Sequence, residues 1–258
     1  MVKKKYILVT GGSGFLGTAI VKELLEKGYY VIMTFKSKTS AKKLKSLFKG
    51  YDNYYCLFKC DFLEKINQKK LVSFIKKKFK YLNGVVNNAY SGAVGSIDHI
   101  DEEDFLDSFN LNVLSPFYLI KNLKQQLIAG AKKFKSSSSV VNIASIYGIL
   151  SPNYNFYKDS KFQNSINYGA TKASLIQMTR YFSCNFSPRN IRFNSISPGP
   201  FPNLTKQLKI KLLQKYKMPM LRFGRPEEIA GPVEFLLSNK SSYINGANII
   251  VDGGWSSW

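Results

Sequence analysis

The chain has 258 residues, 45% of them hydrophobic, so it is long enough to bury one large core. No apolar run approaches the ~18 residues of a membrane span, and three scattered cysteines are too few for a disulfide framework. The single histidine, His99, excludes a histidine-based metal site, so we expect no metal. The basic N-terminus runs too soon into glycines to be a signal peptide, which predicts a cytoplasmic protein.

The net charge is +22, carried mostly by lysine. The lysines are spread over the predicted helices and form no basic stripe with repeated aromatics, so we expect neither nucleic acid nor a membrane as partner. Compositional bias explains most of this charge. A positive field still attracts small anions such as dinucleotides and phosphorylated substrates.

Apolar runs alternate with segments of helical period along the chain. The predicted strands are 6–10, 30–35, 54–59, 82–87, 139–144, 191–196 and 247–251. The predicted helices are 15–27, 40–49, 64–79, 102–133, 167–186 and 226–238. This alternation predicts an α/β fold over 1–258 as one domain: a Rossmann-type, doubly wound, seven-stranded parallel sheet with helices on both faces.

Two irregular segments follow strand ends, where ligands bind in open α/β sheets. They are an insertion at about 150–166 and a candidate substrate lid at about 199–220. Both are expected beside the substrate.

A glycine-rich turn follows the first strand in T-G-G-S-G-F-L-G, at 10–17. Glycines at 11, 14 and 17 permit a tight turn, a close approach to a pyrophosphate and close packing of the helix on the strand. The helix N-terminus then offers free N–H groups to the anion. We therefore expect a dinucleotide to bind at Gly11, Ser13, Gly14, Phe15, Leu16 and Gly17.

The second predicted strand ends in T-F-K-S, without the acidic residue that an NAD site usually carries there. Lys36 and Ser37 are candidates to hold a 2′-phosphate, which favours NADP(H) slightly over NAD(H). A solvated lysine at the end of a strand is the competing interpretation.

Tyr168 and Lys172 stand four residues apart, so a helix places both on one face. A nearby cation lowers the pKa of a tyrosine, which then serves as a general acid or base near pH 7. Ser145 stands 23 positions upstream and supplies a hydroxyl to hold the substrate oxygen.

Further motifs occur in a set order and, together with those above, resemble the short-chain dehydrogenase/reductase family, in its short single-domain branch. They are C-D-F with Asp61 and Phe62, N-N-A-Y with Asn88 and Ala89, F-N-L-N-V with Asn112, N-I-A-S with Ser145, Y-G-A-T-K with Tyr168 and Lys172, S-P-G with Pro198 and Gly199, and the V-D-G-G tail. The resemblance covers nearly the whole chain.

The resemblance implies a role for each residue of a catalytic tetrad. Tyr168 transfers a proton to or from the substrate oxygen, and Lys172 lowers the pKa of Tyr168 and binds the nicotinamide ribose. Ser145 orients the carbonyl, and Asn112 holds a water that links Lys172 to solvent. Asp61 lies beside the adenine. The resemblance also implies a homotetramer or homodimer.

Three departures from the family pattern stand out. Phe15 occupies the place of the middle glycine and Gly14 precedes it, as in the extended branch of sugar-nucleotide epimerases and dehydratases. Tyr90 replaces a glycine and is expected to crowd the cofactor cleft. The gap from Ser145 to Tyr168 is long; its excess at 152–165 is polar and aromatic, should overhang the substrate, and resembles family members in bacterial surface-glycan biosynthesis.

These observations predict an NAD(P)-dependent oxidoreductase acting on a carbonyl/secondary-alcohol pair. A small-molecule sugar or sugar nucleotide is the first candidate substrate, because sugars stack on aromatic rings. A 3-oxoacyl-(acyl-carrier-protein) thioester is the second. A redox-neutral sugar-nucleotide dehydratase or epimerase and a non-catalytic dinucleotide-binding sensor remain as alternatives.

Overall fold

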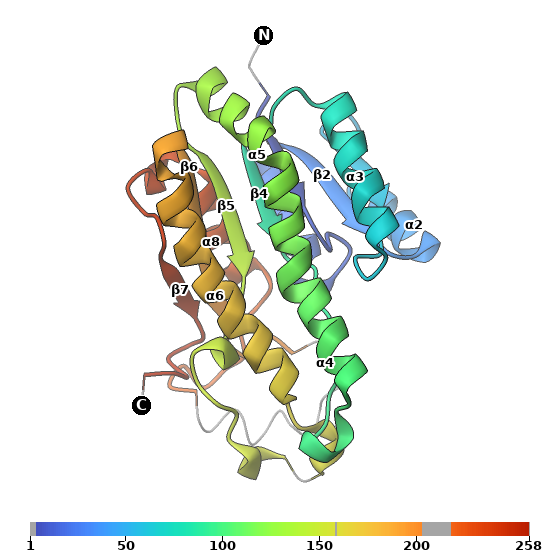
Figure 1. Cartoon of the computed structure of the whole chain (residues 1–258), viewed down its shortest axis with the longest axis vertical. Coiled ribbons are helices and arrows are strands. Elements are labelled where there is room, and N and C mark those ends of the chain that lie inside the picture. The colour runs from blue at the N-terminus through green and yellow to red at the C-terminus, as the bar shows by residue number, and fades with distance from the viewer. Residues whose placement is uncertain (1–3, 158, 203–217, 258) are drawn as a thin grey trace.

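The protein is described by a computed structural model that covers residues 4–157, 159–202 and 218–257. Seven parallel strands form one sheet in the order β3-β2-β1-β4-β5-β6-β7 (Figure 1). Their bounds are β1 Tyr6–Val9, β2 Tyr30–Phe35, β3 Tyr55–Lys59, β4 Gly84–Asn87, β5 Ser138–Ile143, β6 Ile191–Pro198 and β7 Asn248–Val251. The predicted doubly wound sheet is confirmed.

Helices cover both faces of this sheet, and α5 and α6 lie in front of it in Figure 1. Side chains of α1, α2 and α8 pack in the hydrophobic cluster on one face, and those of α3, α5 and α6 in the cluster on the other. The bounds are α1 Phe15–Glu26, α2 Lys38–Leu47, α3 Lys65–Lys78, α4 Glu102–Phe109, α5 Ser115–Phe134, α6 Ile166–Phe186 and α8 Glu227–Leu237. Among the described residues, no helix is both long and apolar enough to cross a membrane.

Neighbouring residues of each central strand enter opposite layers. In β1, Ile7 and Val9 pack in the cluster of α1 and α8, whereas Leu8 packs in the cluster of α3 and α5. All three side chains are fully buried. Burying one such side chain stabilises the fold by about 1.5–3 kcal/mol. Because both faces are covered, the strands need no polar alternation, which explains their apolar runs.

The helix predicted over 102–133 is interrupted in the structure. A π-helical segment, Asn110–Leu114, separates α4 from α5. Pro116 has no N–H to donate to the carbonyl four residues before it, so a regular α-helix cannot continue through this point. The Ser115 hydroxyl instead donates to the Asn110 carbonyl at 2.9 Å. The interruption turns Asn112 toward the start of α6.

The insertion at 150–166 consists of short turns that lead into α6, including the 3₁₀ turns Tyr154–Phe156 and Ser160–Phe162. Its end is fastened to the segment after β4 by an antiparallel bridge between Val94 and Asn164. Most of the predicted lid at 199–220 falls at 203–217, which lies outside the described residues.

Candidate active site

The turn between β1 and α1 has the geometry of an anion cradle. Gly11 has a φ of +63°, and a Cβ there would lie 2.9 Å from the Ala89 Cα. A Cβ on Gly17 would overlap the carbonyl oxygen of Gly11. Only glycine therefore fits at either position without a shift of the backbone. These two residues bring the start of α1 close to the ends of β1 and β4.

Buried polar side chains hold this turn in place. The Thr10 hydroxyl accepts from the N–H groups of Asn88 and Ala89 at 2.9 and 3.0 Å. The Asn88 amide donates to the Thr10 and Gly11 carbonyls, and the Thr34 hydroxyl accepts from the Gly11 N–H. The first turn of α1 carries neither a side-chain cap nor an acidic residue, so its N–H groups are left for an anion.

A cleft of about 510 Å³ runs along the carboxyl ends of the strands, past this turn. Parallel α/β sheets bind their ligands at this edge, and a dinucleotide fits the anion cradle described above. The cleft gathers nearly all residues predicted for a dinucleotide: Gly11, Ser13, Gly14, Phe15, Leu16, Gly17, Lys36, Asp61, Phe62, Asn88, Ala89, Tyr168, Lys172, Pro198 and Gly199.

Ser37 is the exception, since it does not line the cleft. Its hydroxyl caps α2, accepting from the Ser40 N–H at 3.1 Å. Serine at an extended N-cap position turns its oxygen toward the first turn of its own helix. Contact of Ser37 with a 2′-phosphate stays a prediction, since a hydroxyl that accepts one hydrogen bond can still donate its own proton.

Lys36 lies at the edge of the cleft, paired with Asp61. Its Nζ is 2.8 Å from Oδ2 of Asp61, and its side chain is 71% exposed. Burial acts to raise the pKa of Asp61, but hydrogen bonds from Lys36 and from the Leu63 N–H outweigh it and hold that pKa below its usual value. A carboxylate and an exposed cation therefore lie together at the end of the cleft next to β2.

Helix α6 places Tyr168 and Lys172 on one face, as their spacing predicted, and both line the cleft together with Ser145. The Lys172 side chain is buried, and its Nζ donates to the Ile143 carbonyl at the end of β5 at 2.7 Å. That Nζ lies 5.6 Å from the centre of the Tyr168 ring. The predicted phenol, amine and hydroxyl thus meet at one point.

The predicted lowering of the Tyr168 pKa was wrong. Burial raises the pKa of Tyr168 to about 12, against a lowering by the Ser145 hydrogen bond and with a further rise from Tyr90. Burial also lowers the pKa of Lys172 to about 7. The lysine is therefore only partly charged at neutral pH and points at a carbonyl, so it does little to favour a phenolate.

Asn112 ties the site together through its side-chain amide. Its Oδ1 accepts from the Ser91 N–H at 3.0 Å, and its Nδ2 donates to the Ser91 carbonyl and to the Thr171 hydroxyl. The Asn112 side chain thereby joins the segment after β4 to α6. The water expected on Asn112 stays a prediction, for which the second lone pair of Oδ1 is free.

Tyr90, which was predicted to crowd the cofactor cleft, is among the residues that line it. Its ring meets that of Tyr168 edge-on at 6.1 Å between centres, and the Lys172 Nζ lies 5.5 Å from its centre. Cations interact favourably with aromatic faces at such distances. Tyr90 therefore contributes to the burial and electrostatics of the catalytic groups.

A second cavity of about 210 Å³ adjoins the cleft and shares Ser145, Tyr168, Gly199 and Phe201 with it. The insertion contributes Tyr157, Phe162 and Asn164 to its wall; its other lining residues are Val94, Ile146, Tyr147, Pro200 and Pro202. The insertion thus lies beside Ser145 and Tyr168. That it overhangs a substrate stays a prediction.

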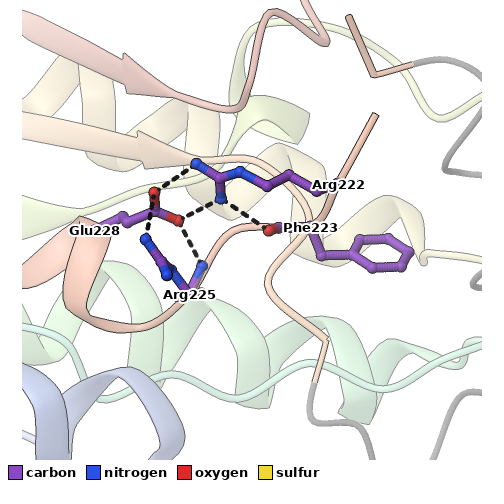
Figure 2. Close-up of polar contacts among 4 residues, drawn as sticks. All are labelled: Arg222, Phe223, Arg225 and Glu228. Carbon is purple, nitrogen blue, oxygen red and sulfur yellow. Dashed lines mark hydrogen bonds and ion pairs between the residues drawn. The ribbon is translucent and has the colours of Figure 1, made fainter. Parts of the chain in front are cut away.

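The chain returns to this region after residue 217 through an ion-paired turn. Figure 2 shows Glu228, near the start of α8, held by both terminal nitrogens of Arg222 at 2.7 Å and by the Arg225 N–H at 2.8 Å. Hydrogen bonds from Arg222 and then from the Arg225 N–H lower the pKa of Glu228 to about 2. Phe223, in this turn, packs against the cluster of Ile146, Met218 and Trp255, and Ile146 directly follows Ser145.

Several residues that line the cleft were not predicted. Each lies at or just past the carboxyl end of a strand, or next to a predicted residue. They are Thr34, Phe35, Cys60, Leu63, Ser91, Leu111, Ile143, Ala144 and Phe201. The strand ends were themselves the signal that locates them. In the described part of the chain, no three His, Cys, Asp or Glu side chains gather to hold a metal ion.

Comparison with known proteins agrees with this geometry. The family profile described as enoyl-(acyl carrier protein) reductase matches residues 13–256. The chain belongs to the short-chain dehydrogenase/reductase family, whose members are NAD(P)-dependent oxidoreductases, and it is such an enzyme.

Three curated relatives illustrate the range of activities. The chain is 28% identical to 7alpha-hydroxysteroid dehydrogenase of Bacteroides fragilis, covering 98% of the chain and 94% of the relative. It is 31% identical to 3-oxoacyl-[acyl-carrier-protein] reductase FabG of Buchnera aphidicola subsp. Schizaphis graminum, covering 98% of each. It is 27% identical to L-rhamnose-1-dehydrogenase of Scheffersomyces stipitis, covering 98% of the chain and 96% of the relative.

Solved structures share the fold over at least 93% of their length. The Pseudomonas aeruginosa RhlG/NADP complex superposes with a TM-score of 0.87 at 26% identity, over 98% of this chain and 97% of that one. The structure of ElxO with NADP superposes with a TM-score of 0.84 at 27% identity, over 99% of this chain and 100% of that one. A short-chain dehydrogenase from Leptospira borgpetersenii with NAD+ superposes with a TM-score of 0.84 at 26% identity, over 98% of this chain and 93% of that one. These relatives do not support the expected likeness of this chain to enzymes of surface-glycan biosynthesis.

Proposed function

We propose that this enzyme reduces a carbonyl to a secondary alcohol with NADP(H). The observation that carries this proposal is the meeting of Ser145, Tyr168 and Lys172 where the dinucleotide cleft joins a second cavity. The dinucleotide, when bound, supplies the hydride. Ser145 holds the substrate oxygen, and Tyr168 gives that oxygen its proton.

The protonation states of the site favour the reductive direction. A phenol with a pKa of about 12 keeps its proton at neutral pH and is an acid in the resting site. A neighbouring amine with a pKa of about 7 has a proton to return to the phenol after each turnover. Lys172 thus acts as a proton reservoir for Tyr168 more than as a fixed charge beside it.

The end of β2 supports NADP(H) over NAD(H). An acidic side chain there would repel a 2′-phosphate, and this chain has Lys36 in that place, exposed and able to turn from Asp61 toward an anion. Some of the similar structures hold NADP and one holds NAD+, so the family alone does not decide.

Replacing Lys36 with alanine tests this preference. Lys36→Ala should raise the Kd for NADPH about tenfold and change the Kd for NADH less than threefold, because only NADPH carries the phosphate that the ammonium would hold. Calorimetric titration measures both constants. Lys43→Ala removes an equally exposed lysine from α2, away from the cleft, and should change neither. An equal loss for both dinucleotides in Lys36→Ala would contradict the preference.

The second cavity supports a compact hydroxylated substrate such as a keto-sugar. Its wall is rich in aromatic side chains, including Tyr147, Tyr157 and Phe162. The Tyr147 and Tyr157 hydroxyls lie 3.5 Å apart and supply polar atoms among the rings. Sugar rings pack their apolar faces on aromatic side chains and hydrogen-bond at their edges.

A 3-oxoacyl thioester is the second candidate substrate. The observation that favours it is the recurrence of 3-oxoacyl-[acyl-carrier-protein] reductases among the relatives at 28–31% identity. The lysine-rich surface would also attract an acidic carrier protein.

One screen tests the proposed reaction and ranks these substrates. Oxidation of NADPH and of NADH is followed at 25 °C with keto-sugars, sugar nucleotides and acetoacetyl thioesters. Net consumption of NADPH with a keto-sugar supports the proposal and excludes a redox-neutral dehydratase or epimerase. Turnover of thioesters alone would reverse the order of substrates, and no turnover with any carbonyl would favour a dinucleotide sensor.

We also propose a homodimer or homotetramer that forms through α4, α5 and α6. Large apolar side chains are exposed on these helices and on the π-helical segment between α4 and α5: Leu106 at 62%, Leu114 at 44%, Phe117 at 42% and Tyr181 at 71%. Exposed apolar surface of this kind marks a contact between subunits. Light scattering coupled to size exclusion should give two or four times the 29.3 kDa of one chain, and the mass of one chain would refute the assembly.

A further inference from the structure

Gly224 lies in the ion-paired turn before α8, at a point with no room for a side chain. A Cβ on Gly224 would overlap Cε1 and Cζ of the Phe201 ring, and the three atoms nearest to it would all belong to that ring. The φ of Gly224 does not lie in the left-handed region, so the backbone by itself does not call for glycine. The Phe201 ring is therefore what excludes a side chain here.

The backbone at Gly224 is fastened on two sides. Its own N–H donates to the Pro200 carbonyl at 3.1 Å. The next N–H along the chain, that of Arg225, donates to Glu228 at 2.8 Å, and both terminal nitrogens of Arg222 hold the same carboxylate (Figure 2). An added methyl group therefore meets a backbone that does not yield readily, so the neighbouring ring has to move.

The open space next to Phe201 lies in the two cavities. Phe201 lines both the dinucleotide cleft and the second cavity, as Ser145 and Tyr168 do. Phe201 also packs against the hydrophobic cluster of α1 and α8, and protein interiors are too densely packed to take in a displaced ring. A shift of Phe201 away from Gly224 therefore reduces the space beside the two catalytic groups.

We infer that Gly224 sets the size of carbonyl substrate that the enzyme accepts, because the lack of a side chain there lets Phe201 stand back from Ser145 and Tyr168. The inference rests on the proposed reduction of a carbonyl at Tyr168. Gly224 lines neither cavity, so it is a positioning residue that acts through Phe201. A substrate with bulk beyond its carbonyl needs the space that a displaced ring would take, whereas a compact ketone does not.

Cyclohexanone and 4-tert-butylcyclohexanone are matched probes, since they share the reacting carbonyl and differ only in bulk on the far side of the ring. Saturating NADPH keeps any change in dinucleotide affinity out of the comparison. Gly224→Ala should lower kcat/KM for 4-tert-butylcyclohexanone about tenfold or more and leave kcat/KM for cyclohexanone within about threefold of wild type. Phe201→Trp enlarges the ring while keeping Gly224, and it should lower the ratio of the two values in the same direction.

A double-mutant cycle shows whether the Phe201 ring carries the effect. In a Phe201→Ala background the added methyl group displaces nothing, so Gly224→Ala should change the ratio of the two kcat/KM values by less than about threefold. The matched control is Gly231→Ala, a change within α8 at which an added Cβ meets no atom within 4 Å. Gly231→Ala should leave the ratio at its wild-type value.

The inference is overturned if Gly224→Ala affects both ketones equally, or if its effect on the ratio persists without the Phe201 ring. Should Gly224→Ala alone fail to fold, two results would each overturn it: an unchanged ratio in Phe201→Trp, or a double variant that unfolds at a lower temperature than Phe201→Ala.

If wild type reduces neither ketone, the proposed function fails separately, and the affinities of the two ketones, measured by calorimetry with NADPH present, replace kcat/KM in the cycle. Gly224→Ala should then weaken only the binding of 4-tert-butylcyclohexanone. Equal weakening of both ketones, or no binding of either to wild type, would overturn the role of Gly224.

Discussion

Tyr168→Phe should lower kcat for the best substrate of the screen by about 10³-fold, since general acid catalysis contributes typically 10²–10⁴. The phenylalanine ring fills the same space against Tyr90, so only the hydroxyl is lost. We therefore expect the Kd for NADPH to stay within about twofold of wild type. Steady-state kinetics and calorimetric titration measure the two effects separately.

The control for this variant is Tyr154→Phe, which removes a hydroxyl from an exposed tyrosine of the insertion. It should keep kcat within about twofold. Retention of more than a tenth of the activity by Tyr168→Phe would contradict its assignment as the proton donor. Loss of dinucleotide binding together with activity would indicate damage to the cleft.

Lys172→Met should raise the free energy of unfolding at pH 6, on the order of 3 kcal/mol, while lowering kcat about 10²-fold or more. Burial lowers the pKa of Lys172 from 10.5 to about 7, so a proton on this amine opposes folding. Methionine fills similar volume without a charge. The hydrogen bond to the Ile143 carbonyl is lost and reduces the gain.

The pH dependence gives the sign of this effect. Between pH 7 and 10.5 the unfolded chain binds a proton on Lys172 that the folded protein has released, so wild-type stability rises with pH across this window. The difference between Lys172→Met and wild type should therefore be largest below pH 7 and shrink toward pH 10.5. Urea unfolding at pH 6, 8 and 10 measures it.

Lys161→Met is the matched control, because it removes an exposed lysine from the insertion. It should change the free energy of unfolding by less than about 0.5 kcal/mol at each pH. A Lys172→Met variant that is less stable than wild type at pH 6 would show that the amine is charged and well paired in the folded protein.

The sequence predicted best those features that depend on neighbours along the chain. The turn at Gly11 and Gly17 lies between a strand and a helix that are contiguous with it, so its position followed directly. Tyr168 and Lys172 share a face because a helical turn has 3.6 residues. The doubly wound parallel sheet followed from the alternation of strands and helices, which gives right-handed crossovers.

Features that depend on distant contacts were predicted less well. The pKa of Tyr168 is set first by burial among residues from several segments, which its spacing to Lys172 does not reveal. Ser37 caps α2, which begins at Lys38 and not at residue 40 as predicted. The interruption of the helix predicted over 102–133 has a local cause, because Pro116 lacks the N–H that a regular helix needs there.

The two cavities have a wall in common, formed by Ser145, Tyr168, Gly199 and Phe201. A molecule bound on one side of this wall restricts the positions open to the same four residues on the other side. By thermodynamic linkage, any factor by which the dinucleotide changes the affinity for substrate must equal the factor by which substrate changes the affinity for the dinucleotide. We therefore expect a substitution at any of these four residues to change the affinity for the dinucleotide and the affinity for the substrate together.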